Sequence, residues 1–397
     1  MSSWPRSVYV AAGAMTPFGR KTDGSSPRDW VCQVVARALD EAQMRSGDID
    51  AVVVASESDF LSLQVSLSAV LLDDLALSPR PVMRVESGGA SGAMAIRSAI
   101  QHILSGLHDT VLVIGVEHAA SHLASDDVRA VYGLSFDADT EGLAGITATA
   151  LYALSMQDHM ARHGTTPQQM ASVSVKNHSN ARFNPDAHKP MDITIEDVLA
   201  SPMVSDPYRL LDCSLISDGA AAVVLTSKPQ VLSRRYPKVR LAGSGCATDA
   251  LRLGERTSPG DFTAKALAAK QAYAQAGVTD PEGQVGFAEV YDAYTGAEIQ
   301  AIEALGLCEP GRAAAVLAGG GFSPGQPLCV NLSGGLIGQG GPPGATGVAQ
   351  IYTLLRLLQG RYHAALQGNT SRRYALADSH GGVGTVCVVH VLEREDG

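Results

Sequence analysis

Two short glycine-rich segments have the clearest potential for chemistry in this sequence. Gly89-Ala-Ser-Gly92 and Gly344-Ala-Thr-Gly347 have nearly the same letters, and each opens a run with the pattern of a helix. The first N–H groups of a helix lack partners within the helix, and the helix dipole places positive charge at the same end. Two such ends that converge would stabilise an oxyanion, as in an enolate or a tetrahedral thioester intermediate. The same glycines would also let helices pack closely on strands, and the spacing alone leaves both interpretations open.

The elements that would position these segments recur in the same order in both halves of the chain. Apolar, β-branched runs predict strands, and a spacing of three to four residues between apolar positions predicts helices. In the first half we expect strands at 7–12, 51–55, 82–85 and 110–116, and helices from 27 and over 93–104. In the second half we expect strands at 239–243, 287–291, 329–331 and 385–392, and helices over 264–276, 295–305 and 347–358.

This repeated order predicts an α/β protein built from two duplicated halves. Strands that alternate with helices favour a mixed or mostly parallel sheet that is covered on both faces. We expect the N-terminal half at residues 1–118 and the C-terminal half at 237–397. Residues 119–236 carry most of the His, Met, Asp and Asn clusters, with helical segments such as Leu151–Arg162, and are expected to form an inserted loop domain.

Composition and charge exclude several classes of function. The chain has 397 residues, of which 45% are hydrophobic and 18% charged, which is typical of a globular protein. Its net charge of −10 argues against nonspecific binding to nucleic acid or anionic membranes. No apolar run reaches the ~18 residues of a membrane helix, and Met1–Tyr9 has no signal-peptide core. The six cysteines show no ligand spacing, so we expect reduced thiols in a cytoplasmic protein.

Four longer segments between Val85 and Gly347 form a further pattern. They are Val85-Glu-Ser-Gly-Gly-Ala-Ser-Gly92; Lys176-Asn-His through Asp212-Cys-Ser-Leu-Ile-Ser-Asp-Gly219; Glu289-Val-Tyr-Asp-Ala-Tyr-Thr295 with Glu303-Ala-Leu-Gly-Leu-Cys-Glu-Pro310; and Asn331-Leu-Ser-Gly-Gly335 through Gly344-Ala-Thr-Gly347. The pattern resembles the thiolase superfamily, in particular the sterol-carrier-protein-type thiolases and the lipid-transfer proteins grouped with them. The resemblance implies a five-layer αβαβα fold and a homodimer that buries a sheet edge.

The sequence departs from this family at the residues that normally perform the chemistry. Gly89 stands where thiolases carry the nucleophilic cysteine, and a glycine cannot form an acyl-enzyme. Gly341, in Gly340-Gly-Pro-Pro-Gly344, stands where the family has its activating histidine. Tyr291-Asp-Ala-Tyr294 replaces the His-Asp-Cys-Phe motif of sterol-carrier-type thiolases. Acyl transfer through a cysteine is therefore not expected.

The residues that remain suit a different reaction. The resemblance places four side chains toward the active site, namely Tyr291, Asp292, Tyr294 and His380, and four glycines in oxyanion-type loops, namely Gly89, Gly341, Gly344 and Gly382. A tyrosine hydroxyl can donate a proton to an alkoxide or enolate, and a histidine near neutrality can act as general base. These groups suit aldol or retro-aldol chemistry on a β-hydroxyacyl-CoA, which needs no cysteine.

Alternatives from other classes stay open. The steroid side-chain aldolases are similar proteins that lack the cysteine, use tyrosines and work with a small zinc-containing OB-fold partner, but Gly338–Gly344 contains no second tyrosine. A Cys-independent Claisen enzyme or acyltransferase, a catalytically silent thiolase-like subunit, and thiolysis by a displaced cysteine are the other hypotheses. Each singled-out residue also has a plain interpretation: the tyrosines as core, the aspartate as a cap, and His380 as a loop histidine with satisfied hydrogen bonds.

A coenzyme A thioester is expected as substrate rather than as a tightly bound cofactor. The phosphates of CoA need cations or N–H groups, and the inserted region offers Lys176, Arg182, Lys189 and Arg209, although such residues are usually plain surface. Four histidines of this region lack a ligand pattern, so we expect a solvated or CoA-facing surface and no metal site; they are His159, His163, His178 and His188.

Overall fold

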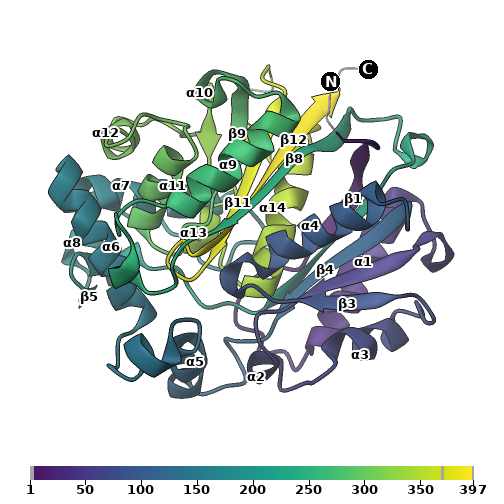
Figure 1. The fold of residues 1–397 in the computed structure, drawn as a ribbon, viewed down its shortest axis with the longest axis horizontal. Helices are drawn as coiled ribbons and strands as arrows, with labels where there is room; N and C mark the ends of the chain where they lie inside the picture. The colour runs from purple at the N-terminus through teal and green to yellow at the C-terminus, as the bar shows by residue number, and fades with distance from the viewer. Residues whose placement is uncertain (1–3, 368–370, 396–397) are drawn as a thin grey trace.

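A ten-stranded sheet runs through the molecule, and helices cover it in layers (Figure 1). This computed structural model describes residues 4–367 and 371–395, so residues 1–3 of the expected N-terminal half and residues 368–370 and 396–397 of the expected C-terminal half lie outside the described residues. The strand order is β10-β9-β11-β12-β8-β1-β7-β4-β2-β3. The strands are β1 (Val8–Met15), β2 (Ala51–Ala55), β3 (Val82–Val85), β4 (Thr110–Glu117), β7 (Gly219–Thr226), β8 (Lys238–Thr248), β9 (Val285–Glu289), β10 (Cys329–Val330), β11 (Tyr374–Gly381) and β12 (Val386–Glu395).

The sheet consists of two half-sheets with the same order and the same strand directions. In the first half, β2 is parallel to β3 and β4, and β7 is antiparallel to β4 and β1. In the second half, β9 is parallel to β10 and β11, and β12 is antiparallel to β11 and β8. The halves meet where β1 pairs with β8, at Val8 opposite Leu241. The duplicated α/β architecture is thereby confirmed.

Two helices form the middle layer. α4 (Ser91–Leu104) and α14 (Pro343–Leu358) pack against each other and against strands of both half-sheets, in the centre of Figure 1. α1 (Pro27–Ala42) and α3 (Leu67–Asp74) cover the outer face of the first half, whereas α9 (Thr263–Ala276) and α11 (Thr295–Ala304) cover that of the second. The result is the predicted αβαβα arrangement.

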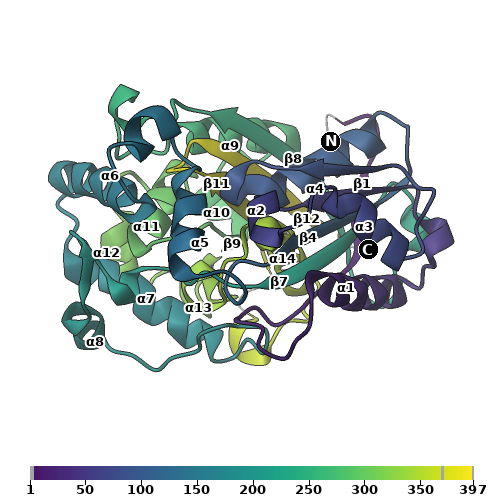
Figure 2. The same ribbon diagram turned by 90° about the horizontal axis from the view of Figure 1, so that it is seen from below.

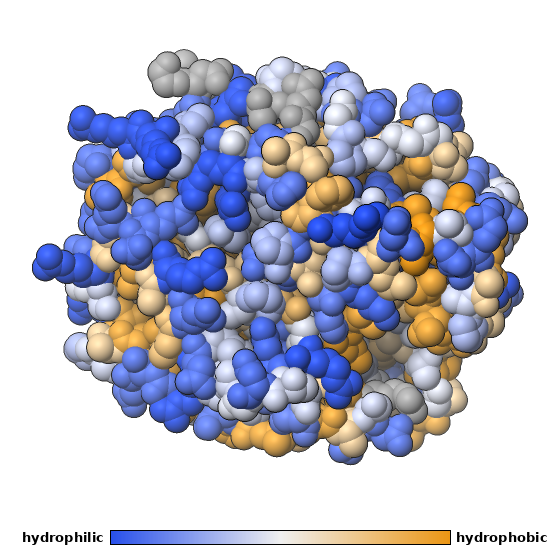
Figure 3. Space-filling model, turned by 180° about the vertical axis from the view of Figure 1, so that it is seen from behind, coloured by the Kyte–Doolittle hydropathy of each residue, from blue (hydrophilic) through white to orange (hydrophobic). Residues whose placement is uncertain are grey.

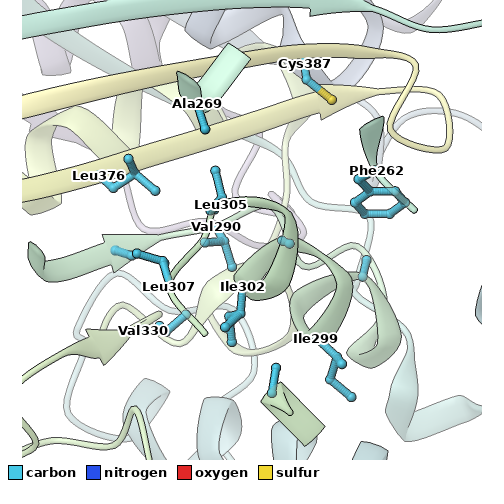
Figure 4. Packing of buried hydrophobic residues seen from close by; sticks show 14 of the residues in the cluster. Phe262, Ala269, Val290, Ile299, Ile302, Leu305, Leu307, Val330, Leu376 and Cys387 are labelled. Carbon is cyan, nitrogen blue, oxygen red and sulfur yellow. The ribbon is translucent and has the colours of Figure 1, made fainter. Parts of the chain in front are cut away.

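Alternating side chains of the strands build the cores between these layers. In β2, Val53 faces α4 and α14, whereas Val52 and Val54 face α1, because successive side chains of a strand point to opposite faces. In the second half, Ile299 and Ile302 of α11, with Leu305 directly after it, pack with apolar residues of the sheet and of α9, as Figure 4 shows.

The segment between the halves is mainly helical. It contains α5 (Ser125–Gly133), α6 (Ala148–His163), α7 (Pro167–Ala181), α8 (Ile195–Ala200) and the small hairpin of β5 (Met203–Ser205) and β6 (Tyr208–Arg209). Threonines start three of these helices, since the side chains of Thr147, Thr166 and Thr194 accept the N–H groups of the first turn. The range 119–236 also includes β7, which belongs to the first half-sheet. Short helices α2 (Asp59–Ser62), α10 (Pro281–Gln284), α12 (Ala313–Ala318) and α13 (Gly335–Gly338) complete the chain.

The structure adds two strands to the large sheet that the sequence pattern did not reveal. β7 begins with the small residues Gly-Ala-Ala-Ala before its β-branched end, and β11 reads Tyr-Ala-Leu-Ala-Asp-Ser-His-Gly, with polar residues in its second half. The predicted strand 385–392 corresponds to β12, and β12 is the counterpart of β7 rather than of β4. His380 consequently lies within a buried strand, and its prediction as part of a glycine-rich loop was wrong.

The surface gives no indication of a membrane span. Among the described residues, no helix is long and apolar enough to cross a bilayer. The face shown in Figure 3 mixes hydrophilic residues with several separate hydrophobic patches.

Candidate active site

The two glycine-rich segments converge where α4 crosses α14. A Cβ atom at Gly92 would lie 2.8 Å from the backbone nitrogen of Gly347, so the two backbones are in direct contact. A larger residue at either position would push the helices apart. Close helix packing is thus one reason for these glycines, and the crossing also brings the starts of both helices to the same place.

A cavity of about 940 Å³ opens beside this crossing. Its wall comes from both halves and from the segment between them, including α5, α6 and the residues before β7. Six residues that the sequence pointed to line it, namely Gly89, Tyr291, Tyr294, Gly341, His380 and Gly382. Most of its remaining wall is apolar, which is typical of a site for a small molecule.

The hydroxyl of Tyr291 fills the space that a side chain at position 89 would need. A Cβ atom at Gly89 would lie 2.7 Å from the Cζ atom of Tyr291, nearer still to its hydroxyl oxygen, and 2.6 Å from the carbonyl oxygen of His380. Burial raises the pKa of Tyr291 far above its ordinary value, and the nearby Glu57 carboxyl adds to this effect, so the phenol is protonated. A proton donor therefore stands where a nucleophile would otherwise project.

Both ring nitrogens of His380 are engaged. Nε2 lies 2.8 Å from the hydroxyl of Tyr152, which donates to the carbonyl of Gly382 at 2.7 Å, so Nε2–H must donate to Tyr152. On the other side, the Lys265 ammonium donates to Nδ1 at 3.1 Å. Burial and this ammonium lower the pKa of His380 well below its usual value. The ring is neutral and has no free nitrogen for a substrate proton.

A buried ion pair contacts both His380 and the backbone of Tyr291. Lys265 and Asp378 pair with no solvent exposure of either side chain, and Asp378 also accepts the backbone N–H of Tyr291 at 3.3 Å. A buried pair of this kind is costly to break, because the remaining charge loses its partner. The pair fixes the ring of His380 and the backbone of Tyr291 relative to each other.

Tyr294 and Asp292 lie in different environments. Tyr294 lines the cavity, hydrogen-bonds Thr149 at 2.9 Å and packs on Tyr152 with ring centroids 4.6 Å apart. Asp292 is fully buried outside the cavity wall, where it accepts the Leu336 N–H at 2.6 Å and an Asn177 N–H at 2.8 Å. Its position favours the plain interpretation, a cap for the start of α13.

Two glutamates at the site were missed by the sequence analysis. Glu117 accepts hydrogen bonds from Ser56 Oγ at 3.0 Å and from the N–H groups of Glu57 at 2.7 Å and Gly344 at 3.1 Å. Glu57 lines the cavity and accepts a hydrogen bond at Oε1 from Ser135 Oγ at 3.2 Å, whereas its Oε2 has no partner among the described residues. Burial raises the pKa of Glu57 to about 8 and that of Glu117 to about 7. No motif marks either residue, because strand ends from different parts of the chain bring them to the site.

Two tyrosines of the inserted segment complete the wall. Tyr132 lies on α5 and Tyr152 lies on α6, and both line the cavity. They lie more than 100 residues from Tyr291 in sequence, so the spacing gave no signal.

Two N–H groups of the predicted oxyanion loops already have hydrogen-bond acceptors within the protein. The Gly344 N–H is bound to Glu117, and the Gly341 N–H donates to Ser217 Oγ at 3.3 Å. Gly382 has φ +61°, which favours glycine, and its carbonyl takes the Tyr152 hydroxyl. Gly344 does not line the cavity; its closest neighbours are backbone atoms of the strands β2 and β4.

The four cations predicted for CoA do not line the cavity. Lys176 is buried and donates to Glu298, Asn177 and Val330, so it has no hydrogen left for a phosphate. The other three lie at the surface: Arg182 pairs with Asp192 at 2.8 Å, Arg209 donates to the Ser201 carbonyl at 3.0 Å, and Lys189 is exposed.

A different cation lies at the cavity. Arg20 is exposed and belongs to the cavity wall. Burial and the positive charges of Lys189, Arg20 and Lys21 lower the pKa of His188, so these three cations lie near that ring, although Lys21 and Lys189 are not among the residues that line the cavity. The positive charge of Arg20 suits an anionic group.

The inserted-region histidines divide into separate environments. His159 and His163 approach Glu303 so that one ligand atom of each lies within 4.8 Å of the others, and His159 Nε2 is 3.0 Å from Glu303. Within the described residues this is the one group of three that has the geometry for a cation. It lies outside the cavity wall, whereas His178 binds the Lys189 carbonyl and His188 binds Ser217.

One cysteine does reach the cavity. Cys213 lines it, but burial raises the pKa of the thiol to about 12, and the thiol donates to the Arg209 carbonyl at 3.3 Å. A thiol in this state is a poor nucleophile.

Comparisons with known proteins agree with the fold. "Thiolase, N-terminal domain" matches residues 8–229, and "Thiolase C-terminal domain-like" matches residues 245–394. An "Acetyl-CoA acetyltransferase" of Methanothermobacter thermautotrophicus is 36% identical over 392 residues, 98% of this chain and 100% of the relative. A "17-hydroxy-3-oxo-4-pregnene-20-carboxyl-CoA lyase" of Mycobacterium tuberculosis is 27% identical over 366 residues, 88% and 92% of the two chains. The solved "Ltp2-ChsH2(DUF35) aldolase" has a TM-score of 0.84 at 23% identity, over 100% of both chains.

Proposed function

Because this chain belongs to the thiolase family, we propose that it makes or breaks a carbon–carbon bond in a CoA thioester without a cysteine nucleophile. The reaction that fits best is aldol or retro-aldol chemistry on a β-hydroxyacyl-CoA. One observation carries the proposal: Tyr291 occupies the space beside Gly89, so that no side chain can project there to be acylated.

The cavity residues have distinct parts in this reaction. The protonated hydroxyl of Tyr291 donates a hydrogen bond to the thioester oxygen, which stabilises the enolate that forms as the Cα–Cβ bond breaks. His380, held by Lys265 and Tyr152, positions Tyr291 rather than removing a proton. Arg20 at the cavity wall takes a phosphate of CoA, and the apolar wall takes the acyl chain.

The names of two similar proteins support this proposal. One relative is a carboxyl-CoA lyase, and a solved structure of similar fold is an aldolase. The more similar acetyl-CoA acetyltransferases point to acyl transfer instead. This chain retains their fold but has glycines at 89 and 341, so acyl transfer through a cysteine at this place has no nucleophile.

A Claisen-type acyltransferase that dispenses with the cysteine is the second candidate, and the acetyltransferase relatives favour it. It predicts product only when an acyl donor and a carbon nucleophile are both present. A catalytically silent subunit, the third candidate, predicts no turnover by the isolated chain and activity only in complex with a second protein.

We also propose that the chain assembles as a homodimer through the free edge of β3. This strand ends the sheet, Met83 on it is 41% exposed, and the neighbouring Phe60, Leu63 and Val65 expose 65, 69 and 72% of their surface. Light scattering after size-exclusion chromatography gives a dimer if this is correct and a monomer if not.

A small zinc-containing OB-fold protein is the proposed second partner. The similar aldolase structure carries two protein names, and one of them is marked DUF35. Co-expression with a neighbouring gene for a small protein with paired CxxC motifs should yield a complex that contains zinc. Separate elution of the two proteins would contradict this part of the proposal.

The direct test of function is product analysis. The chain is incubated, alone and with such a partner, with a β-hydroxyacyl-CoA, and the release of an aldehyde or ketone is followed. Tyr291→Phe should lower the rate strongly, because the hydroxyl is lost while the ring remains. Undiminished cleavage by Tyr291→Phe would contradict the role of the hydroxyl, and product formed only with an added acyl donor would favour the acyltransferase.

A further inference from the structure

The retro-aldol reaction needs a group that accepts the proton of the β-hydroxyl, and Glu57 at the cavity wall has a carboxyl oxygen without a partner among the described residues. We propose that Glu57 is this proton-transferring residue and that it also returns the proton to Cα of the product. This inference rests on the proposed function, but it makes a claim about Cα that can be tested without cleavage.

The carboxyl of Glu57 has one oxygen bound and one oxygen open. Oε2 of Glu57 is shielded from solvent and, within the part of the chain that the structure describes, has no hydrogen-bond partner, although Glu57 lines the cavity. An unpartnered buried carboxyl oxygen is costly, so most such atoms are paired. Because Oε1 is held by Ser135 and Oε2 is left open, the carboxyl is oriented with one oxygen ready for a ligand.

The carboxyl of Glu57 lies close to the hydroxyl of Tyr291. Oε1 of Glu57 lies 3.8 Å from where a Cβ atom of Gly88 would be, and the next residue, Gly89, contacts Tyr291. The carboxyl and the phenol therefore stand side by side over the Gly88–Gly89 turn. Glu57 precedes α2 and Ser135 follows α5, two helices that lie next to each other in Figures 1 and 2. A substrate on this turn meets both groups at once.

Burial and neighbouring carboxylates disfavour the ionised form of Glu57. Glu117 from β4 and Glu86 after β3 repel the ionised form of Glu57, and Tyr132 and Tyr291 present phenols that resist ionisation. Burial and these charges raise the pKa of Glu57 to about 8, so the carboxyl can both lose and regain a proton near neutral pH. Glu117 differs, because three donors already bind its two oxygens.

The step balances without any further reagent. The Glu57 carboxylate takes the proton of the β-hydroxyl, the oxygen forms the new C=O bond, and the Cα–Cβ bond breaks. Its electron pair moves to the thioester as an enolate, whose oxygen accepts a hydrogen bond from Tyr291. Glu57, now protonated, delivers this proton to Cα, which yields the shortened acyl-CoA and restores the carboxylate.

The test uses butanoyl-CoA in D₂O, because this saturated thioester has no β-hydroxyl and cannot be cleaved. The full chain, with its partner if one co-purifies, should exchange the α-protons for deuterium, as mass spectrometry detects. Glu57→Gln should lower the exchange about 10²–10⁴-fold, the usual contribution of a general acid–base group. Glu309→Gln is the matched control, because Glu309 lies at the surface with 80% of its side chain exposed.

The outcomes separate this inference from the proposed function. Exchange that depends on Glu57, without any cleavage of a β-hydroxyacyl-CoA, supports Glu57 and contradicts the aldolase. Exchange by a folded Glu57→Gln variant within threefold of the native rate, or none by the native protein, overturns the assignment of Glu57. If Glu57→Gln does not fold, the pH dependence of the exchange rate is compared between the native protein and Glu57→Asp. The native rate should rise with pH, with an apparent pKa near 8. The same pH dependence in Glu57→Asp would overturn the assignment.

Discussion

Substitution of Gly89 by alanine tests whether Tyr291 really fills the place beside it. The new Cβ atom would lie 2.7 Å from Cζ of Tyr291 and 2.6 Å from the His380 carbonyl oxygen, both well inside van der Waals contact. Forcing one extra carbon into a packed site costs about 1–3 kcal/mol. We therefore expect Gly89→Ala to lower the free energy of unfolding by this amount and to reduce turnover, because the phenol must move.

A double-mutant cycle identifies the cause. In a Tyr291→Ala background the ring is absent, so Gly89→Ala should cost less than in the native protein, although the His380 carbonyl still limits the space. Gly254→Ala is the control, since no atom lies within 4 Å of a Cβ atom there, and it should change stability by less than about 0.5 kcal/mol. Urea unfolding followed by circular dichroism measures the four chains of the cycle and the control variant. A cost for Gly89→Ala that is below about 0.5 kcal/mol, or equal in both backgrounds, would refute the reasoning.

Four further outcomes follow from the contacts at the site. Tyr152→Phe should destabilise the protein by about 1–3 kcal/mol in thermal unfolding, because it leaves buried polar groups unpaired. Lys265→Met should cost about 3–5 kcal/mol, since it leaves a buried carboxylate alone. Arg20→Ala should raise KM for the CoA ester about two- to fivefold with little change in kcat, whereas Arg182→Ala should change neither. Burial raises the folded-state pKa of Glu57 to about 8, above its unfolded value. The stability that protonated Glu57 contributes is therefore complete below its unfolded pKa and is lost as the pH rises through 8. The melting temperature should fall less between pH 5 and pH 8.5 in Glu57→Gln than in the native protein.

The sequence was most informative where local pattern decides the structure. Apolar strands such as β2 and β4 and the helices α4 and α14 have a strong periodicity, and the duplication followed from their order. β11 was not predictable in this way, because its buried Asp378, Ser379 and His380 have their partners on other elements.

The site was predictable only where a motif marks it. Gly89, Tyr291 and Tyr294 could be found because the family pattern gives their positions, and the structure brings them to one cavity. Glu57 and Tyr152 carry no local signal, since only the tertiary fold brings a strand end and an inserted helix to the same wall. The histidine near the C-terminus looked like a free base for the same reason: its lysine neighbour is far away in the sequence.

The central claim is that this thiolase fold works without an acylated cysteine. The most direct measurement combines product analysis with intact-mass spectrometry of the protein during turnover of a β-hydroxyacyl-CoA. We predict a released aldehyde or ketone and a shortened acyl-CoA, with the protein mass unchanged throughout. An acyl adduct that maps to a cysteine, Cys213 above all because it lines the cavity, would contradict the account.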